Sequence, residues 1–350
     1  MLVAHPARRL GVVVALAVLT ACGPSQPVGP GSAVTSGSSA GTADGQAPSG
    51  TGGASAAASP AATASSLVAT PLSVSLPAPS SRMVVLPVGD HLLVLGGLSG
   101  GVTTTDVLAL TPQAVSLVGH LARPTHDAGG AVLGGRALVL GGGVQASTDP
   151  VQAIGLDGGT GTVVGHLPQA RSDHAVAADG GTAYVVGGYA AGGELADVLA
   201  TTDGTTFRTV AHLATTVRYA AAALAGGALW VLGGQHAGTD VDLVQRVDLS
   251  SGAVTVAGRL PTSLSHAAAV TLDGAVLLVG GIRGPARQDT VYRLDPSSAT
   301  VSVAAHLPRP TSDMGAAVLG GAVYVVGGET TDAAGKVTAL AGVVRLQPTN

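Results

Sequence analysis

Polar and titratable side chains recur at one spacing along this chain, and their types could do chemistry. Six pairs of adjacent glycines recur, from Gly96-Gly97 to Gly327-Gly328. The residue fourteen positions before each pair is polar or titratable in every copy, although the residues that follow it are mostly apolar: Arg82, Asp127, Asp173, Tyr219, His266 and Asp313. Three adjacent side chains extend the set: His126, His174 and Arg218. Carboxylates and imidazoles with tuned pKa values can act as acid and base pairs.

Two interpretations of this set are open. The polar residues could cap strands that begin at the solvent edge, or they could line a ligand pocket. The side-chain types differ from copy to copy, which suits an asymmetric small ligand. Loops after the glycine pairs could add further groups: Tyr189, Gln235, His236, Arg283 and Glu329. Hard cations take carboxylates and zinc takes imidazole, but no spacing here is diagnostic of a metal site. We therefore assign no metal, no cofactor and no catalytic residue.

The glycine pairs define the elements that must position these side chains. The first glycines of successive pairs lie 45, 46, 46, 47 and 47 residues apart. A fixed period of this size is typical of repeat architectures. The third copy reads as four short strands over 174–178, 182–188, 197–201 and 207–213, with a turn at Asp179-Gly180-Gly181 between the first two. Short strands at even spacing with glycine turns predict an all-β propeller.

A family resemblance supports the same fold. The run that ends in Tyr184-Val185-Val186-Gly187-Gly188 resembles the Kelch repeat, with its double glycine and preceding aromatic residue. The resemblance extends over about 280 residues in six copies. It implies a six-bladed, Kelch-type β-propeller.

The ends of the repeats predict how the ring closes. The last copy stops after 343–346, which matches the third strand of the fifth copy at 291–294, so it lacks a fourth strand. The segment Ser73–Pro79 resembles the missing strand. We expect this N-terminal strand to complete the C-terminal blade, which would remove exposed sheet edges. Strand direction alternates within a blade, so the polar set and the loops after the glycine pairs should share one mouth of the central channel.

The N-terminus resembles a targeting signal. Arg8-Arg9 precede an apolar stretch of about ten residues, which is too short to span a bilayer. It ends in Leu19-Thr20-Ala21-Cys22, which resembles a bacterial lipobox, and Cys22 is the single cysteine of the chain. An ordinary secretory signal with an incidental cysteine is the alternative. We expect residues 1–21 to be a lipoprotein signal peptide and Cys22 to be lipidated, anchoring the protein to the membrane outside the cytoplasm.

Composition and charge predict the remaining domain boundaries and exclude one class of partner. After Cys22 the chain is rich in Gly, Ser, Ala, Thr and Pro, which predicts a flexible linker over 22–66 and a propeller over 67–350. The formal net charge is −4 and no basic stripe is present, so we expect no nucleic-acid partner. A propeller closed in this way should be monomeric.

The sequence favours a binding or scaffold module for envelope glycans or envelope proteins over an enzyme. Copper-radical oxidases that resemble galactose oxidase need a cysteine–tyrosine crosslink, and the only cysteine here is the expected lipidation site. The alternative is a sugar epimerase or mutarotase, as the Kelch resemblance to bacterial proteins acting on sialic acid implies. Its acid and base would come from the channel mouth: Asp127, Asp173, His174, His266 and Asp313.

Overall fold

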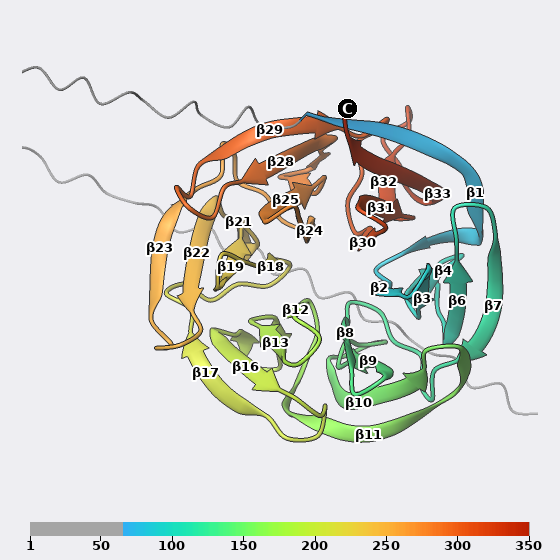
Figure 1. Cartoon of the computed structure of the whole chain (residues 1–350), viewed down its shortest axis with the longest axis horizontal. Helices are drawn as coiled ribbons and strands as arrows, with labels where there is room; N and C mark the ends of the chain where they lie inside the picture. The colour runs from blue at the N-terminus through green and yellow to red at the C-terminus, as the bar shows by residue number, and fades with distance from the viewer. Residues whose placement is uncertain (1–65, 350) are drawn as a thin grey trace, which may run out of the picture. The chain divides into compact units, whose positions relative to one another are not determined.

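The computed structural model describes residues 66–349, and every regular element in that range is a β-strand (Figure 1). Within this range no helix is long and apolar enough to span a membrane. Six blades of four antiparallel strands surround a central channel, and Figure 1 views the ring along that channel. The signal peptide, the linker and Cys22, all predicted from the sequence, lie outside the described residues.

The blades follow the chain in order. Blade I contains β2 (Val84–Val88), β3 (His91–Leu95), β6 (Asp106–Leu110) and β7 (Val115–His120). Blade II contains β8 (Gly129–Leu133), β9 (Arg136–Leu140), β10 (Thr148–Gly155) and β11 (Gly158–Arg171). Blade III contains β12 (Ala175–Ala178), β13 (Ala183–Val186), β16 (Asp197–Thr201) and β17 (Arg208–His212). Blade IV contains β18 (Ala221–Ala225), β19 (Ala228–Leu232), β22 (Leu243–Asp248) and β23 (Val254–Arg259). Blade V contains β24 (Ala268–Leu272), β25 (Ala275–Val279), β28 (Thr290–Leu294) and β29 (Val301–His306).

Blade VI joins the two ends of the described chain. It contains β30 (Gly315–Leu319), β31 (Ala322–Val326), β33 (Val337–Pro348) and, as its outer strand, β1 (Leu67–Ser81). Figure 1 shows β1 lying along β33. Strands β1 and β33 pair antiparallel from Leu67 opposite Pro348 to Ser80 opposite Leu340, with two irregularities between. The predicted six-bladed propeller with N-terminal closure is confirmed, and the closing strand is longer than the predicted 73–79.

Short hairpins follow the glycine pairs in several blades. The sequence predicted only loops at these places. They are β4 (Leu98–Ser99) with β5 (Val102–Thr103), β14 (Tyr189–Ala190) with β15 (Gly193–Glu194), β20 (Gln235–His236) with β21 (Thr239–Asp240), and β26 (Ile282–Arg283) with β27 (Ala286–Arg287). In blade VI, β32 (Glu329–Thr331) pairs with the beginning of β33. These hairpins extend the loop face around the channel mouth.

The glycine pairs are required by both backbone conformation and space. Gly141 has a φ of 59°, and a Cβ there would lie 2.7 Å from the carbonyl oxygen of Arg171. At Gly233 a Cβ would collide with the carbonyl oxygen of Leu264. Any other residue would face left-handed strain together with a clash against the segment where the chain passes from the outer strand to the next blade. The pairs thus let the chain leave the second strand while adjacent blades stay in close contact.

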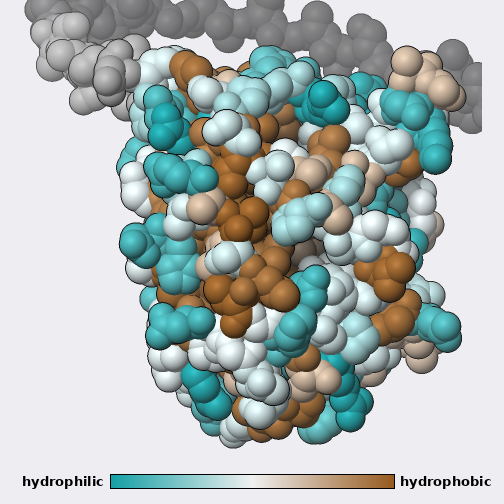
Figure 2. Space-filling model, turned by 90° about the vertical axis from the view of Figure 1, so that its right-hand side faces the viewer, coloured by the Kyte–Doolittle hydropathy of each residue, from teal (hydrophilic) through white to brown (hydrophobic). Residues whose placement is uncertain are grey.

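Apolar side chains from adjacent blades fill the space between the sheets. Leu93, Leu138 and Leu277, each three residues before a glycine pair, are fully buried, and Trp230 occupies the same position in blade IV. Outside this core, the flank of the ring over β1, β7 and β11 presents apolar side chains between polar ones (Figure 2). Val68 of β1 and Leu117 of β7 are exposed. The core therefore lies between blades, and the innermost strands stay free to line the channel.

Candidate functional site

The six residues that precede the glycine pairs by fourteen positions form a closed ring of backbone hydrogen bonds. Each backbone N–H donates to the carbonyl oxygen of the equivalent residue in the preceding blade, at distances of 2.7–3.2 Å. The bond from Arg82 N–H to the Asp313 oxygen, at 2.8 Å, closes the circle across the junction between blades VI and I. The ring members are Arg82, Asp127, Asp173, Tyr219, His266 and Asp313. This backbone role explains why the position is fixed within the repeat.

All six ring residues also adopt a left-handed backbone, with φ between 52° and 60°. Such a conformation is uncommon for a residue other than glycine and costs of order 1 kcal/mol. Glycine would form the same backbone ring without that cost. Aspartate and histidine adopt this conformation more readily than most residues, whereas Arg82 and Tyr219 have no such preference, so the side chains of these two have a role that the backbone ring does not explain.

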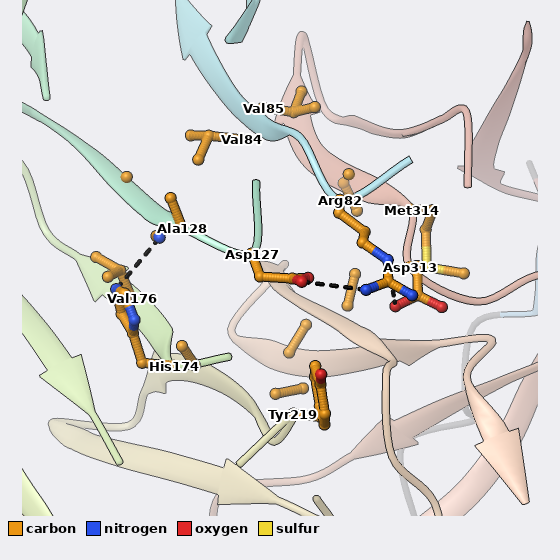
Figure 3. Close-up of a pocket in the computed structure, with 18 of the residues that line it drawn as sticks. Arg82, Val84, Val85, Asp127, Ala128, His174, Val176, Tyr219, Asp313 and Met314 are labelled. Carbon is orange, nitrogen blue, oxygen red and sulfur yellow. Dashed lines mark hydrogen bonds and ion pairs between the residues drawn. The ribbon is translucent and has the colours of Figure 1, made fainter. Parts of the chain in front are cut away.

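Arg82 is the centre of the charged network on the ring (Figure 3). Its Nη1 lies 3.2 Å from Asp127 Oδ2, and its Nε lies 3.2 Å from Glu329 Oε1 and 3.8 Å from Asp313 Oδ1. Glu329 also accepts a hydrogen bond from Arg287 Nη2 at 2.9 Å and one from Ser81 Oγ at 3.0 Å. One guanidinium group thus links carboxylates from blades II and VI beside the ring closure.

The two aspartates that contact Arg82 are in different electrostatic states. Burial is the largest effect on Asp127 and raises its pKa to about 7 against the attraction of Arg82. The negative charges of Asp173 and Asp313 raise the pKa further. Burial alone would also raise the pKa of Asp313, but the hydrogen bond from His266 Nδ1 at 2.7 Å and its charge hold that pKa below the usual range. Asp127 can therefore exchange a proton near neutral pH, whereas Asp313 stays ionised.

A second group of ring residues lies on the other side of the channel. The rings of Tyr219 and His266 stack with their centroids 3.7 Å apart. Burial raises the pKa of Tyr219 above its usual range, so the phenol remains protonated and can donate a hydrogen bond. Burial also raises the pKa of Asp173, against the opposing hydrogen bonds from Ser172 and Tyr219. Tyr219 can donate a hydrogen bond and Asp173 can accept one, so the two side chains offer both polarities to a ligand.

A cavity of about 330 Å³ opens above one side of the ring, between the loops of blades II and III. Ring residues Arg82, Asp127, Asp173 and Tyr219 line it, together with His126, Arg218 and Tyr189, which the sequence analysis named. A second cavity, of about 210 Å³, lies along the channel inside the ring and is lined mainly by small apolar side chains. The mouth cavity therefore gathers most of the predicted side chains into one off-centre pocket.

The predicted neighbours of the ring differ in where they lie. His126 stays at the mouth, 3.7 Å from Asp127, and burial together with the Arg82 charge lowers its pKa. His174 does not reach the mouth cavity: it lies buried beside β12, and its Nε2 accepts a hydrogen bond from the backbone N–H of Gly129 at 3.3 Å (Figure 3). Burial lowers the pKa of His174 to about 3, so the ring is neutral. His174 lines the 210 Å³ channel cavity together with the six ring residues, and not the mouth cavity.

Some of the loop residues named from the sequence reach the mouth cavity or the Arg82 network, and others bond side chains within the loops. Tyr189 reaches the mouth cavity and Glu329 joins the Arg82 network. Gln235 instead bonds Asp240, and His236 bonds Thr216. The loop over 143–147 supplies mouth residues that the sequence analysis missed, among them Gln145 and Ser147. Their position directly after a glycine pair was a usable signal, but blade II has no paired hairpin there to mark it. Among residues 66–349 no group of three or more potential metal ligands occurs.

Comparison with known proteins supports the fold. A family model of the Kelch motif matches residues 263–308, which correspond to blade V from just before its ring residue to just after β29. No curated protein matches the chain. The six repeats, the all-β architecture and this match define a Kelch-type β-propeller. A Kelch repeat suggests a binding module or a protein-interaction module.

Proposed function

We propose that this propeller is a binding module whose channel mouth takes a small polar ligand, with an envelope glycan fragment as the expected class. One observation carries the proposal. Four blades bring chemically different side chains to one 330 Å³ cavity. The four ring residues among them have a left-handed backbone, which is uncommon for residues other than glycine. Cavities of this size are typical of small-ligand sites. Acceptors at Asp173 and donors at Tyr219 suit the hydroxyl groups of a sugar.

The proposal is tested by melting the purified protein with a panel of monosaccharides, disaccharides and envelope glycan fragments. A ligand at about 100 times its Kd stabilises the folded state by about 2.7 kcal/mol. For a domain of this size that corresponds to a rise in Tm of roughly 5–10 °C. Ser147→Ala and Asp173→Asn, both at the mouth cavity, should reduce the rise.

The matched control is Arg259→Met, which changes an exposed side chain on the outer strand β23. It should leave the ligand-induced rise intact. A rise that survives both mouth substitutions, or no rise with any member of the panel, would contradict a glycan site at the mouth.

We further propose that the module is anchored to the membrane outside the cytoplasm through Cys22. The support is the short apolar stretch followed by Leu19-Thr20-Ala21-Cys22 and the absence of any other cysteine from the sequence. Two or more acyl chains would hold the protein firmly, since each buried methylene contributes about 0.8 kcal/mol.

Cys22→Ser should move the protein from the membrane fraction to the soluble fraction of a bacterial host. Thr20→Ser keeps a small residue in the same motif and should leave it on the membrane. Fractionation with immunodetection measures both. Equal membrane retention of the Cys22→Ser protein would contradict lipid anchoring.

An epimerase or mutarotase remains the second candidate, and the chemistry of Asp127 favours it. A carboxyl whose pKa is raised to about 7 can donate and accept a proton at neutral pH. The neutral His126 imidazole lies 3.7 Å from it. For any ligand found in the screen, anomer exchange followed by NMR decides: a rate increase that Asp127→Asn abolishes would identify an enzyme.

A further inference from the structure

One position of the repeat changes its chemistry in two of the three blades that bring it to the mouth cavity. The residue immediately before each ring residue is serine in four blades, at Ser81, Ser172, Ser265 and Ser312. Each of these hydroxyls bonds a nearby side chain: Ser81 with Glu329, Ser172 with Ser147, Ser265 with Asp240 and Ser312 with Asp313. The two exceptions are His126 and Arg218, and both line the 330 Å³ cavity. Serine serves the fold at this position, so the exceptions need another explanation.

The backbone at Arg218 is the same as at the serines. Arg218 forms an isolated bridge with Gln235, just as Ser172 does with Tyr189 and Ser265 with Ile282. The blade therefore places no special demand on this residue. Its long cationic side chain is additional to what the repeat requires.

The Arg218 guanidinium is held in place without a counter-ion. Its Cζ lies 5.0 Å from the centroid of the Tyr189 ring and 5.2 Å from that of Tyr219. Its Nε is buried and has no hydrogen-bond partner. Across residues 66–349 no carboxylate comes within salt-bridge distance of it. A partly buried cation with no partner is costly, because its lost hydration is not replaced.

Other arginines of the ring and its surroundings are paired, which sets Arg218 apart. Arg82 contacts Asp127 and Glu329, Arg287 contacts Glu329, and Arg171 makes a two-point contact with Asp197 at 2.8 and 3.0 Å. In each case a carboxylate of the protein satisfies the guanidinium group. Arg218 has no such carboxylate among residues 66–349 and lines the mouth cavity instead.

We propose that Arg218 binds a carboxylate of the ligand, so that the mouth site selects a hydroxylated acid of the uronic-acid type over the neutral sugar. This inference rests on the proposed function. A guanidinium fork matches a carboxylate with two parallel hydrogen bonds, and the flanking tyrosine rings fix its plane. The rest of the cavity suits the hydroxyl groups, with acceptors at Asp173 and hydroxyls at Ser147 and Ser172.

The neighbouring carboxyl groups do not prevent an anion from binding. Burial raises the pKa of Asp127 to about 7, so its negative charge at neutral pH is reduced. Asp173 interacts with the positive charges of Arg218 and His266, which lower its pKa against the effect of burial. Arg82, which also lines the cavity, adds a positive charge. The cavity can therefore take one negative charge next to Arg218 while hydrogen bonds hold the sugar ring.

The test compares matched ligand pairs: glucose with glucuronate, and galactose with galacturonate, by titration calorimetry and thermal shift on the whole protein. The wild-type protein should bind the better uronate at least tenfold more tightly than its neutral sugar. Arg218→Ser, which restores the residue of four other blades, should remove this preference and leave Tm without ligand within about 2 °C. Arg218→Lys should keep the charge but lose most of the preference, because the fork geometry is lost.

The outcomes separate the inference from the function on which it rests. Equal affinity for neutral sugar and uronate would overturn the role of Arg218 and leave a glycan site standing. A preference that survives Arg218→Ser would overturn it as well. Lactate, as a small hydroxy acid without a sugar ring, should bind far more weakly than the uronates, and equal binding would overturn the sugar-acid class. Binding of none of the four sugars would reject the proposed site itself.

Discussion

Removing residues 66–81 from the chain, so that residue 65 joins residue 82, is expected to abolish the single cooperative unfolding transition of the propeller. These residues form β1, the outer strand of blade VI. Their loss leaves β33 as an unpaired edge and opens the ring between its first and last blades. An exposed strand edge also invites pairing between molecules, so we expect aggregation as well as loss of stability.

The size of the effect follows from what β1 buries and bonds. Val74 and Leu76 are buried in the core shared by blades VI and I. The carbonyl oxygen of Ser80 accepts a hydrogen bond from Gly328 at 2.9 Å, and Ser81 bonds the buried carboxylate of Glu329. Losing one buried leucine alone costs about 2–5 kcal/mol. Native domains are stable by about 5–15 kcal/mol in total, so losing the whole strand exceeds the margin.

A synthetic peptide of residues 66–81 provides the decisive measurement. Added to the shortened chain, it should restore a sharp thermal transition, followed by circular dichroism. The same peptide with Leu76→Asp should fail, because it would bury an unpaired charge. A peptide with Val68→Asp, at an exposed position, is the matched control and should still restore the transition. A shortened chain that melts like the wild type without peptide would show that β1 does not close the ring.

The sequence predicts this closure because a strand that is missing from one copy of a repeat can be recognised by comparison with the other copies. The last copy lacks a fourth strand, and one strand before the first copy has no blade of its own. In a closed ring this strand can complete the last blade. The predicted bounds of the closing strand, 73–79, are less accurate. Its pairing with β33 begins at Leu67, where the alternation of apolar and polar residues is weak. The glycine pairs were equally informative, because close approach of blades leaves few residues that fit.

The backbone ring was predictable in membership but not in geometry. A fixed offset from the glycine pairs identified the six ring residues, since equivalent positions in a repeat lie on one circle. Sequence carries no signal for the left-handed backbone at Asp127 or for the hydrogen bonds that close the ring. His174 lines the channel cavity and not the mouth cavity, because successive residues of a strand point to opposite sides. The off-centre cavity depends on hairpin lengths, which differ between blades.

Arg82→Met is expected to destabilise the protein by about 3–5 kcal/mol at pH 8, because it removes the partner of buried carboxylates. Met keeps most of the apolar stem, so the loss reports mainly on charge. Asp313 would keep His266, and Glu329 would keep Arg287. Asp127 would lose its cationic partner and keep only the neutral His126 among its contacts in residues 66–349. The effect should shrink as pH falls. Arg82 lowers the pKa of Asp313 and Asp127, so its stabilising contribution is present when they are ionised and is lost as they protonate.

Thermal melts of wild type and variant between pH 5 and pH 8 measure this dependence. Asp127, with a pKa raised to about 7, should account for much of the change within that window. At pH 8 we expect Tm to fall by roughly 10 °C, and at pH 5 by clearly less. Arg259→Met is the matched control, since that arginine is exposed, pairs with Asp242 on the surface and should cost less than about 1 kcal/mol at either pH. A loss for Arg82→Met that stays constant across the window would mean that packing, and not compensation of buried charge, is what Arg82 contributes to the ring.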